Sequence, residues 1–159
     1  MDRISSTDRS TLMARIRKKN TKPELAVRRL AHRLGYRFRL HQGDLPGTPD
    51  LVFRSRRKVV FVHGCFWHQH RGCGLARMPK TRLNYWKPKF ARNKAHDHAV
   101  RARLRRKGWS SIVVWECQAN NVALITNMLS RFLGSARRAD KSIGRRVPMT
   151  GFGRTGLKK

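Results

Sequence analysis

Three cysteines and one histidine constrain the fold of this 159-residue chain more than any other feature of its sequence. The four residues are Cys65, His70, Cys73 and Cys117. The first three fall within nine residues, and 43 residues separate them from the fourth. Thiolates and imidazole at such spacings are typical of a closed, tetrahedral zinc site, which would tie the segment 63–73 to a distant part of the chain. We therefore predict a structural zinc, with His68 as the alternative to His70, and unrelated buried thiols as the alternative to a metal site.

The charge of the chain points to a polyanionic partner. The sequence has 38 Lys and Arg against 8 Asp and Glu, a formal net charge of +30. Such an excess destabilises a compact state through self-repulsion unless a polyanion neutralises it. Nucleic acid is the expected polyanion. A membrane surface is a weaker candidate, because the sequence has no long apolar run and no signal-like segment after Met1. The odd number of cysteines indicates a reducing compartment. A ribosomal protein would share this charge, so the charge alone does not indicate an enzyme.

Hydrophobic spacing and turn residues predict an α/β fold, with helices around a mixed sheet. One helix begins after Thr21, where Glu24 completes a capping box, and it ends at Gly35. The predicted strands are 36–41, 50–53, 58–62 and 112–115, and the segment 63–87 is predicted to be irregular. Two further helices are predicted at about 88–107 and at 122–133. The inner faces of these two helices are predicted to hold Phe90, Val100 and Leu104, and Val122, Ile125, Leu129 and Phe132.

The sequence is expected to form one domain over residues 1–133. The first 20 residues are expected to include a short basic helix that contacts DNA. Residues 134–159 set Arg and Lys among Gly, Ser and Thr, which predicts a disordered basic tail. Basic residues of the 88–107 helix, Arg101 among them, are expected to bind phosphates without reading sequence.

Asp50 is the strongest candidate for a ligand of a catalytic metal. The connection 54–57 predicts a hairpin that places Asp50 opposite Phe61 or Val62. Mg²⁺ prefers carboxylate and carbonyl oxygens, so Asp50 and the backbone carbonyl of Val62 are its expected ligands. A cap at the start of the strand is the alternative role for Asp50.

Four more residues are candidates for supporting roles in catalysis. His63 and His68 follow the second strand of the hairpin, and a neutral imidazole can take a proton from water at pH 7. Glu24 is a further candidate, although its capping role alone would explain it. Asp97 lies in register with the inner face of its helix, where it can orient a zinc-ligating histidine.

Three aromatic residues lie in predicted irregular segments: Phe66, Trp67 and Trp86. Apolar side chains can enter a base step, unstack it and kink the duplex. Packing beneath the zinc loop is the alternative role for Phe66 and Trp67.

Four motifs closely resemble the very short patch repair (Vsr) endonucleases. They are Pro46-Gly47-x-Pro49-Asp50, Val60-Phe61-x-His63-Gly64-Cys65-Phe66-Trp67-His68-x-His70, Thr81-Arg82-x-x-x-Trp86 and Trp115-Glu116-Cys117. The resemblance extends from about residue 8 to residue 133. It implies a restriction-endonuclease-like, three-layer sandwich. It also implies an enzyme that nicks DNA 5′ of the thymine in T·G mismatches, which arise when 5-methylcytosine deaminates, commonly in a CT(A/T)GG context.

The resemblance also implies a role for each candidate residue. Asp50 would bind Mg²⁺, His68 would act as general base, and Glu24 and His63 would support the site. The zinc ligands would be Cys65, His70, Cys73 and Cys117, and the intercalating residues Phe66, Trp67 and Trp86. Val62 departs from the family, which usually has Thr there, and one residue is inserted between His70 and Cys73. The expected enzyme is a monomer in the bacterial cytoplasm, associated with the nucleoid, with mismatch-repair proteins as further partners.

Two other functions fit part of the sequence. A non-catalytic, zinc-containing nucleic-acid-binding protein would explain the charge and the cysteines, but not Asp50 beside His63 and His68. A restriction-type nuclease of the same fold, with another DNA target, would explain all three features.

Overall fold

The computed structural model describes residues 19–136 of the chain. The predicted N-terminal helix and the predicted tail from residue 137 onward lie outside the described residues, and both stay predictions. Within residues 19–136, the helices are too short or too polar to cross a membrane.

A three-stranded mixed sheet forms the centre of the fold, in the order β1–β2–β3. β1 (Leu51–Phe53) and β2 (Lys58–His63) make the predicted antiparallel hairpin, and β3 (Ser110–Trp115) runs parallel to β2. A 3-10 turn, η1 (Arg54–Arg56), connects the two hairpin strands. Leu51 pairs with Val60, so Asp50, one residue earlier, lies opposite Phe61. The predicted register is therefore confirmed.

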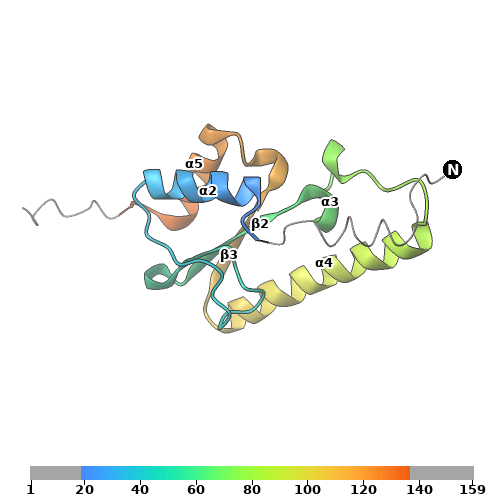
Figure 1. Cartoon of the computed structure of the whole chain (residues 1–159). Coiled ribbons are helices and arrows are strands. Elements are labelled where there is room, and N and C mark those ends of the chain that lie inside the picture. The colour runs from blue at the N-terminus through green and yellow to red at the C-terminus, as the bar shows by residue number, and fades with distance from the viewer. Residues whose placement is uncertain (1–18, 137–159) are drawn as a thin grey trace, which may run out of the picture.

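Helices cover both faces of this sheet, as Figure 1 shows. α2 (Lys22–Arg33) and α5 (Val122–Leu133) lie on one face, and α4 (Leu83–Arg106) lies on the other. Because side chains alternate along a strand, each strand contributes to two cores. Val60 and Val114 pack with α2 and α5, whereas Val59 and Phe61 pack with α4. The predicted mixed α/β fold is confirmed.

α2 begins where the capping residues predict. The hydroxyl of Thr21 accepts a hydrogen bond from the Glu24 backbone N–H at 3.4 Å. The Glu24 carboxylate in turn accepts the backbone N–H of Asn20 at 2.9 Å. Two of the otherwise unpaired N–H groups at this end of the helix are thus satisfied, and Glu24 is fixed in place.

The loop before β1 needs a glycine where it meets α4. Gly47 has a φ of 76°, and a Cβ at this position would lie 2.5 Å from Cγ1 of Val100. Glycine alone adopts this conformation and this approach without strain. The close contact holds the chain that leads into Asp50 against the middle of α4.

The strand predicted for 36–41 is wrong. The segment makes only an isolated bridge between Arg39 and Val52, with N–H···O distances of 2.9 and 2.8 Å. A strand needs consecutive extended residues, and His41 has a φ of 45° that ends the extended course.

The prediction of an irregular 63–87 segment and of a helix from about Pro88 is wrong in part. The segment contains a helical turn, α3 (Cys65–His68), and a 3-10 turn, η2 (Gly74–Ala76). α4 begins at Leu83, five residues early, and contains Pro88. Trp86 and Phe90 stack one turn apart and are 4% and 3% exposed, which anchors these first turns despite the proline.

The inner face of α5 also differs from the prediction, because Leu133 belongs to it and Val122 does not. Val122, at the first position of the helix, is 52% exposed, whereas Leu133 is 2% exposed and packs beside Ile125 and Leu129. Phe132 is partly buried against the same core.

Candidate active site and metal cluster

The four predicted zinc ligands meet at one place. Their ligand atoms all lie within 4.8 Å of one another. Nδ1 of His70 is 3.6 Å from Sγ of Cys65 and 3.4 Å from Sγ of Cys117. Cys117 lies in the turn η3 (Glu116–Gln118), directly after β3, so the cluster joins α3 to the end of the sheet. This is the cross-connection that the spacing predicts.

Two neighbours hold this cluster in shape, and the sequence did not indicate either role. The indole ring of Trp115 stacks on the imidazole of His70, with ring centroids 4.2 Å apart. The Glu116 carboxylate accepts the backbone N–H of Cys65 at 3.1 Å, at the start of α3. Burial raises the pKa of the Cys65 thiol to about 12, so its thiolate form needs a nearby cation. The cluster has the donor set of a soft or borderline metal ion.

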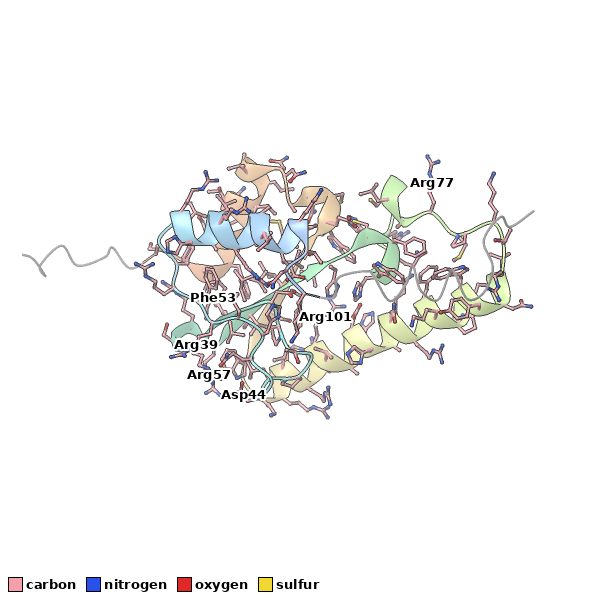
Figure 2. All side chains as sticks on the ribbon, in the orientation of Figure 1. Arg39, Asp44, Phe53, Arg57, Arg77 and Arg101 are labelled. Carbon is pink, nitrogen blue, oxygen red and sulfur yellow. The ribbon has the colours of Figure 1, made fainter. Side chains whose placement is uncertain are left out.

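A second group of side chains lines a cleft of about 310 Å³ between the sheet and α4. The polar residues of this cleft that matter for chemistry are Glu24, His41, Asp50, His63, His68, Asp97 and Arg101. Arg101 lies on the side of α4 that faces the sheet, as Figure 2 shows. The cleft brings together all four predicted catalytic residues and adds His41, Asp97 and Arg101.

Asp50 directly precedes β1, the first strand of the hairpin, and lines this cleft. Its Oδ2 accepts the backbone N–H of Val62 at 2.7 Å, just beyond the paired part of β1. Burial is the largest influence on the carboxyl and raises its pKa to about 6, although the Val62 hydrogen bond opposes the rise. Nearby Glu24 adds to the rise. A largely desolvated carboxylate of this kind favours a bound cation.

His63 and His68 stack in the same cleft. Their ring centroids are 3.8 Å apart, and the planes are inclined by 17°. Nδ1 of His68 lies 2.6 Å from Oδ2 of Asp97, and Nδ1 of His63 lies 3.8 Å from the same oxygen. Burial, and then the charge of His68, lower the pKa of His63 to about 4. Burial alone would raise the pKa of Asp97, but the His68 hydrogen bond and the histidine charges lower it overall.

These distances correct one prediction and resolve one alternative. Asp97 does not orient the histidine of the cysteine cluster, because its hydrogen-bond partner is His68 and not His70. His70, rather than His68, lies among the cysteines. α3 is a single helical turn that starts at Cys65, which belongs to the cysteine cluster, and ends at His68, which lines the cleft.

Glu24 is part of a buried network that the sequence did not predict. Glu24 and Arg28 are 3% and 8% exposed, and their side chains form an ion pair at 2.7 Å. The same Arg28 nitrogen, Nη2, lies 2.7 Å from Nε2 of His41. His41 in turn places Nδ1 at 4.0 Å from Oδ1 of Asp50. Neither Arg28 nor His41 has a distinctive sequence context, so no pattern indicated them.

The three predicted intercalating residues form one aromatic cluster. The ring of Phe66 lies 5.1 Å from Trp67, 5.3 Å from Trp86 and 5.2 Å from Phe90. Phe66 and Trp67 are partly exposed, whereas Trp86 is buried within α4 and not in an irregular segment. The partly exposed pair is thus supported from beneath by α4.

Comparison with known proteins identifies the family. The model of the family "DNA mismatch endonuclease Vsr" matches residues 1–74. The type II nicking enzyme V.XorIIP of Xanthomonas oryzae is 52% identical over 132 residues, which cover 83% of this chain and 96% of that protein. The DNA mismatch endonuclease Vsr of Escherichia coli is 39% identical over 113 residues, 69% of this chain and 72% of that protein. The type II nicking enzyme V.NaeI of Lentzea aerocolonigenes is 42% identical over 113 residues, 68% and 67% of the two chains. This chain therefore belongs to the Vsr family of DNA endonucleases.

Proposed function

We propose that this endonuclease nicks one strand of double-stranded DNA, 5′ of the thymine in T·G mismatches left by deaminated 5-methylcytosine. The observation that carries the proposal is the shared cleft, in which Asp50 and the His68–Asp97 pair line the same space. One partly buried carboxylate that can hold a cation and one oriented imidazole that can take a proton are the two groups that hydrolysis of a phosphodiester needs.

The donor set at Asp50 fits Mg²⁺. In a strand, the N–H and C=O of one residue point to the same side, and the Val62 N–H points to Asp50. The Val62 carbonyl therefore faces the same side, where β1 no longer pairs with β2. Two hard oxygen ligands with room for water are typical of Mg²⁺ in phosphoryl-transfer sites. When bound, the ion would neutralise charge on the phosphoryl oxygens. Val62 replaces the Thr that is usual in the family, but this change of side chain leaves the backbone carbonyl available as a ligand.

His68 is the proposed general base. The Asp97 carboxylate accepts a hydrogen bond from Nδ1–H of His68, so Nε2 of the neutral ring is unprotonated and available to water. Nε2 takes the proton as the water oxygen forms its bond to phosphorus, and the P–O bond to the leaving sugar oxygen breaks. His63 stacks on the base and limits its rotation. Arg101, on α4, contributes a positive charge beside the scissile phosphate.

The Cys65–His70–Cys73–Cys117 cluster is the proposed zinc site, and its four protein ligands leave no open position for chemistry. Zinc there would fix α3, and with it both His68 and the partly exposed pair Phe66 and Trp67. We infer that these two rings enter the DNA beside the mismatch, and that Trp86, the third aromatic residue of the wedge, supports them from its buried position in α4. We also propose that residues 1–133 form one restriction-endonuclease-like sandwich that acts as a monomer. The two helical layers and the mixed sheet within residues 19–133 support the sandwich part of this proposal.

A nicking panel with the cut position mapped tests the proposal. Zinc-loaded protein and Mg²⁺ are combined with labelled duplexes that contain T·G, each other mismatch, or a matched pair, in several flanking contexts. The proposal expects one cut, 5′ of the mismatched thymine, and no cut with D50N. Equal cutting of matched duplexes contradicts the mismatch preference, and absence of any Mg²⁺-dependent cut contradicts the whole assignment.

A second target is favoured by one comparison. The relative that is 52% identical is called a type II nicking enzyme, so its name specifies nicking but no mismatch. On this alternative, the chain would be a nuclease with another DNA target. A panel in which one matched sequence is nicked faster than every T·G duplex would favour it.

A further inference from the structure

The buried side chain of Arg28 occupies a place among three potential metal ligands. Glu24, His41 and Asp50 each offer one ligand atom, and these atoms lie within 4.8 Å of one another. Oε2 of Glu24 and Nε2 of His41 are 3.9 Å apart. Nη2 of Arg28 lies 2.7 Å from each of them. A divalent ion bridging these two atoms would overlap this nitrogen, since metal–oxygen and metal–nitrogen bonds of about 2.1 Å would place it nearly between them.

The same contact fixes which nitrogen of His41 carries the proton. The guanidinium is only a hydrogen-bond donor, so Nε2 of His41 must accept and the neutral ring carries its proton on Nδ1. Nδ1 is the atom that lies 4.0 Å from Oδ1 of Asp50. A protonated nitrogen has no lone pair to offer a metal. Neither nitrogen of His41 is therefore free to act as a ligand while Arg28 is in place.

The guanidinium is held firmly in this position. Nη1 of Arg28 donates to Oδ1 of Asn20 at 2.6 Å, and Nη2 donates to the Glu24 carboxylate. Both partners belong to the capped first turn of α2 or directly precede it. Moving Arg28 away would leave the buried Glu24 carboxylate without a counter-charge, which is costly in a protein interior.

We propose that Arg28 is the resident cation of the Glu24–His41–Asp50 cluster and keeps divalent ions out of it. The proposal rests on the proposed function, because it confines the catalytic metal to the side of Asp50 that faces His68. Glu24 then acts through Arg28, as a positioning residue, and not as a metal ligand. Glu24 therefore supports the site indirectly. It binds the Arg28 guanidinium, and the guanidinium holds His41 beside Asp50.

Manganese binding tests this inference without any DNA. Zinc-loaded, full-length protein is titrated with Mn²⁺, and bound ions are counted by electron paramagnetic resonance. R28M preserves the length of the side chain and removes its charge, so R28M is expected to bind one Mn²⁺ more than the wild-type protein. The double variant R28M/H41Q is expected to lose this additional ion. R29M, on the exposed side of the same helix, is the matched control and should bind as the wild type does.

An equal number of bound ions in R28M and the wild-type protein would overturn the proposal, provided that circular dichroism shows R28M to be folded. If R28M does not fold, H41Q alone decides the matter. H41Q is expected to weaken Mn²⁺ binding by less than about 3-fold. If His41 were a metal ligand, H41Q would weaken binding by about 10-fold or more, because losing even a residue that only supports a ligand typically costs about 10-fold. Failure of the nicking panel would leave the ion count unchanged, so the two hypotheses fail separately.

Discussion

Nδ1 of His68 lies 2.6 Å from Oδ2 of Asp97, and the ring of His63 stacks on His68 at a centroid distance of 3.8 Å. The Asp97 contact fixes the direction of the His68 ring within its plane, and the stacked His63 ring contacts one face of it. Asp97 comes from the middle of α4, whereas His63 is the last residue of β2 and His68 the last residue of α3. The orientation of the proposed base thus depends on α4 packing against the sheet.

D97N is expected to lower kcat for nicking by about 10- to 100-fold, a part of the roughly 10²- to 10⁴-fold that a general base contributes. The amide of Asn can present its N–H₂ group to Nδ1, which favours the wrong tautomer of His68. Single-turnover nicking at saturating Mg²⁺ measures the effect. D44N is the matched control, because Asp44 is an exposed carboxylate paired with Arg54. Equal rates for D97N and D44N would show that Asp97 does not orient the base.

D50N is expected to abolish nicking and to stabilise the protein without added Mg²⁺ above about pH 6. Burial raises the pKa of Asp50 to about 6 from an ordinary value of 3.8. The folded state therefore binds its proton more tightly, and the ionised carboxylate destabilises the fold as pH rises through this window. Asn still accepts the Val62 N–H without a charge.

The measurement for D50N is the difference in Tm from the wild-type protein, from pH 4 to pH 8. The difference should be positive at pH 8 and shrink toward zero at pH 4. A constant difference over this range would show that Asp50 does not titrate as its burial implies. D44N is again the control: its Arg54 hydrogen bond lowers the pKa of Asp44, so it should not gain stability at high pH.

Local sequence signals predicted those parts of the site that depend on short-range geometry. The four-residue hairpin connection fixed the register, and the register placed Asp50 beside Val62. The capping box placed Glu24 at the start of α2. Cysteine spacing predicted that residues far apart in sequence would meet, because few side-chain sets other than a metal site use that pattern.

The remaining parts of the site depend on tertiary packing, which leaves no local signal. Arg28 is one of 38 basic residues, and nothing nearby distinguishes it. His41 reaches the cleft because its φ of 45° ends the expected 36–41 strand. Asp97 could have oriented either His68 or His70, and only the packing of α4 against α3 selects His68. Trp86 appeared irregular because Pro88 suggested a helix start, whereas burial of Trp86 and Phe90 extends the helix.

H70Q is expected to lose the proposed zinc and to lower Tm, because the cluster joins α3 to η3 and metal binding there would contribute folding free energy. Zinc content by mass spectrometry and thermal unfolding measure both effects. H98Q, at an exposed histidine of α4, is the matched control and should keep its zinc. Full zinc content in H70Q would assign the fourth ligand to another residue.

W67A is expected to reduce the preference for T·G over matched duplexes more than it reduces binding to DNA in general. The Trp67 ring is partly exposed and rests on Phe66 and Trp86, so its removal shortens the wedge without opening the sheet. Fluorescence of 2-aminopurine placed beside the mismatch reports unstacking. An unchanged fluorescence increase on binding would indicate that Trp67 only packs beneath the loop.

R101Q is expected to weaken DNA binding and to flatten its salt dependence. Arg101 lines the cleft on α4, one turn after Asp97, and its charge also contributes to the low pKa of His63, after burial and His68. If it contacts one phosphate, the slope of log Kd against log salt concentration should fall by about 0.9. Mismatch preference should be kept, since a phosphate contact carries no base information. R103Q, on the exposed side of α4, is the control. If both variants changed the slope equally, Arg101 would be one of the general phosphate-binding residues and would not belong to the active site.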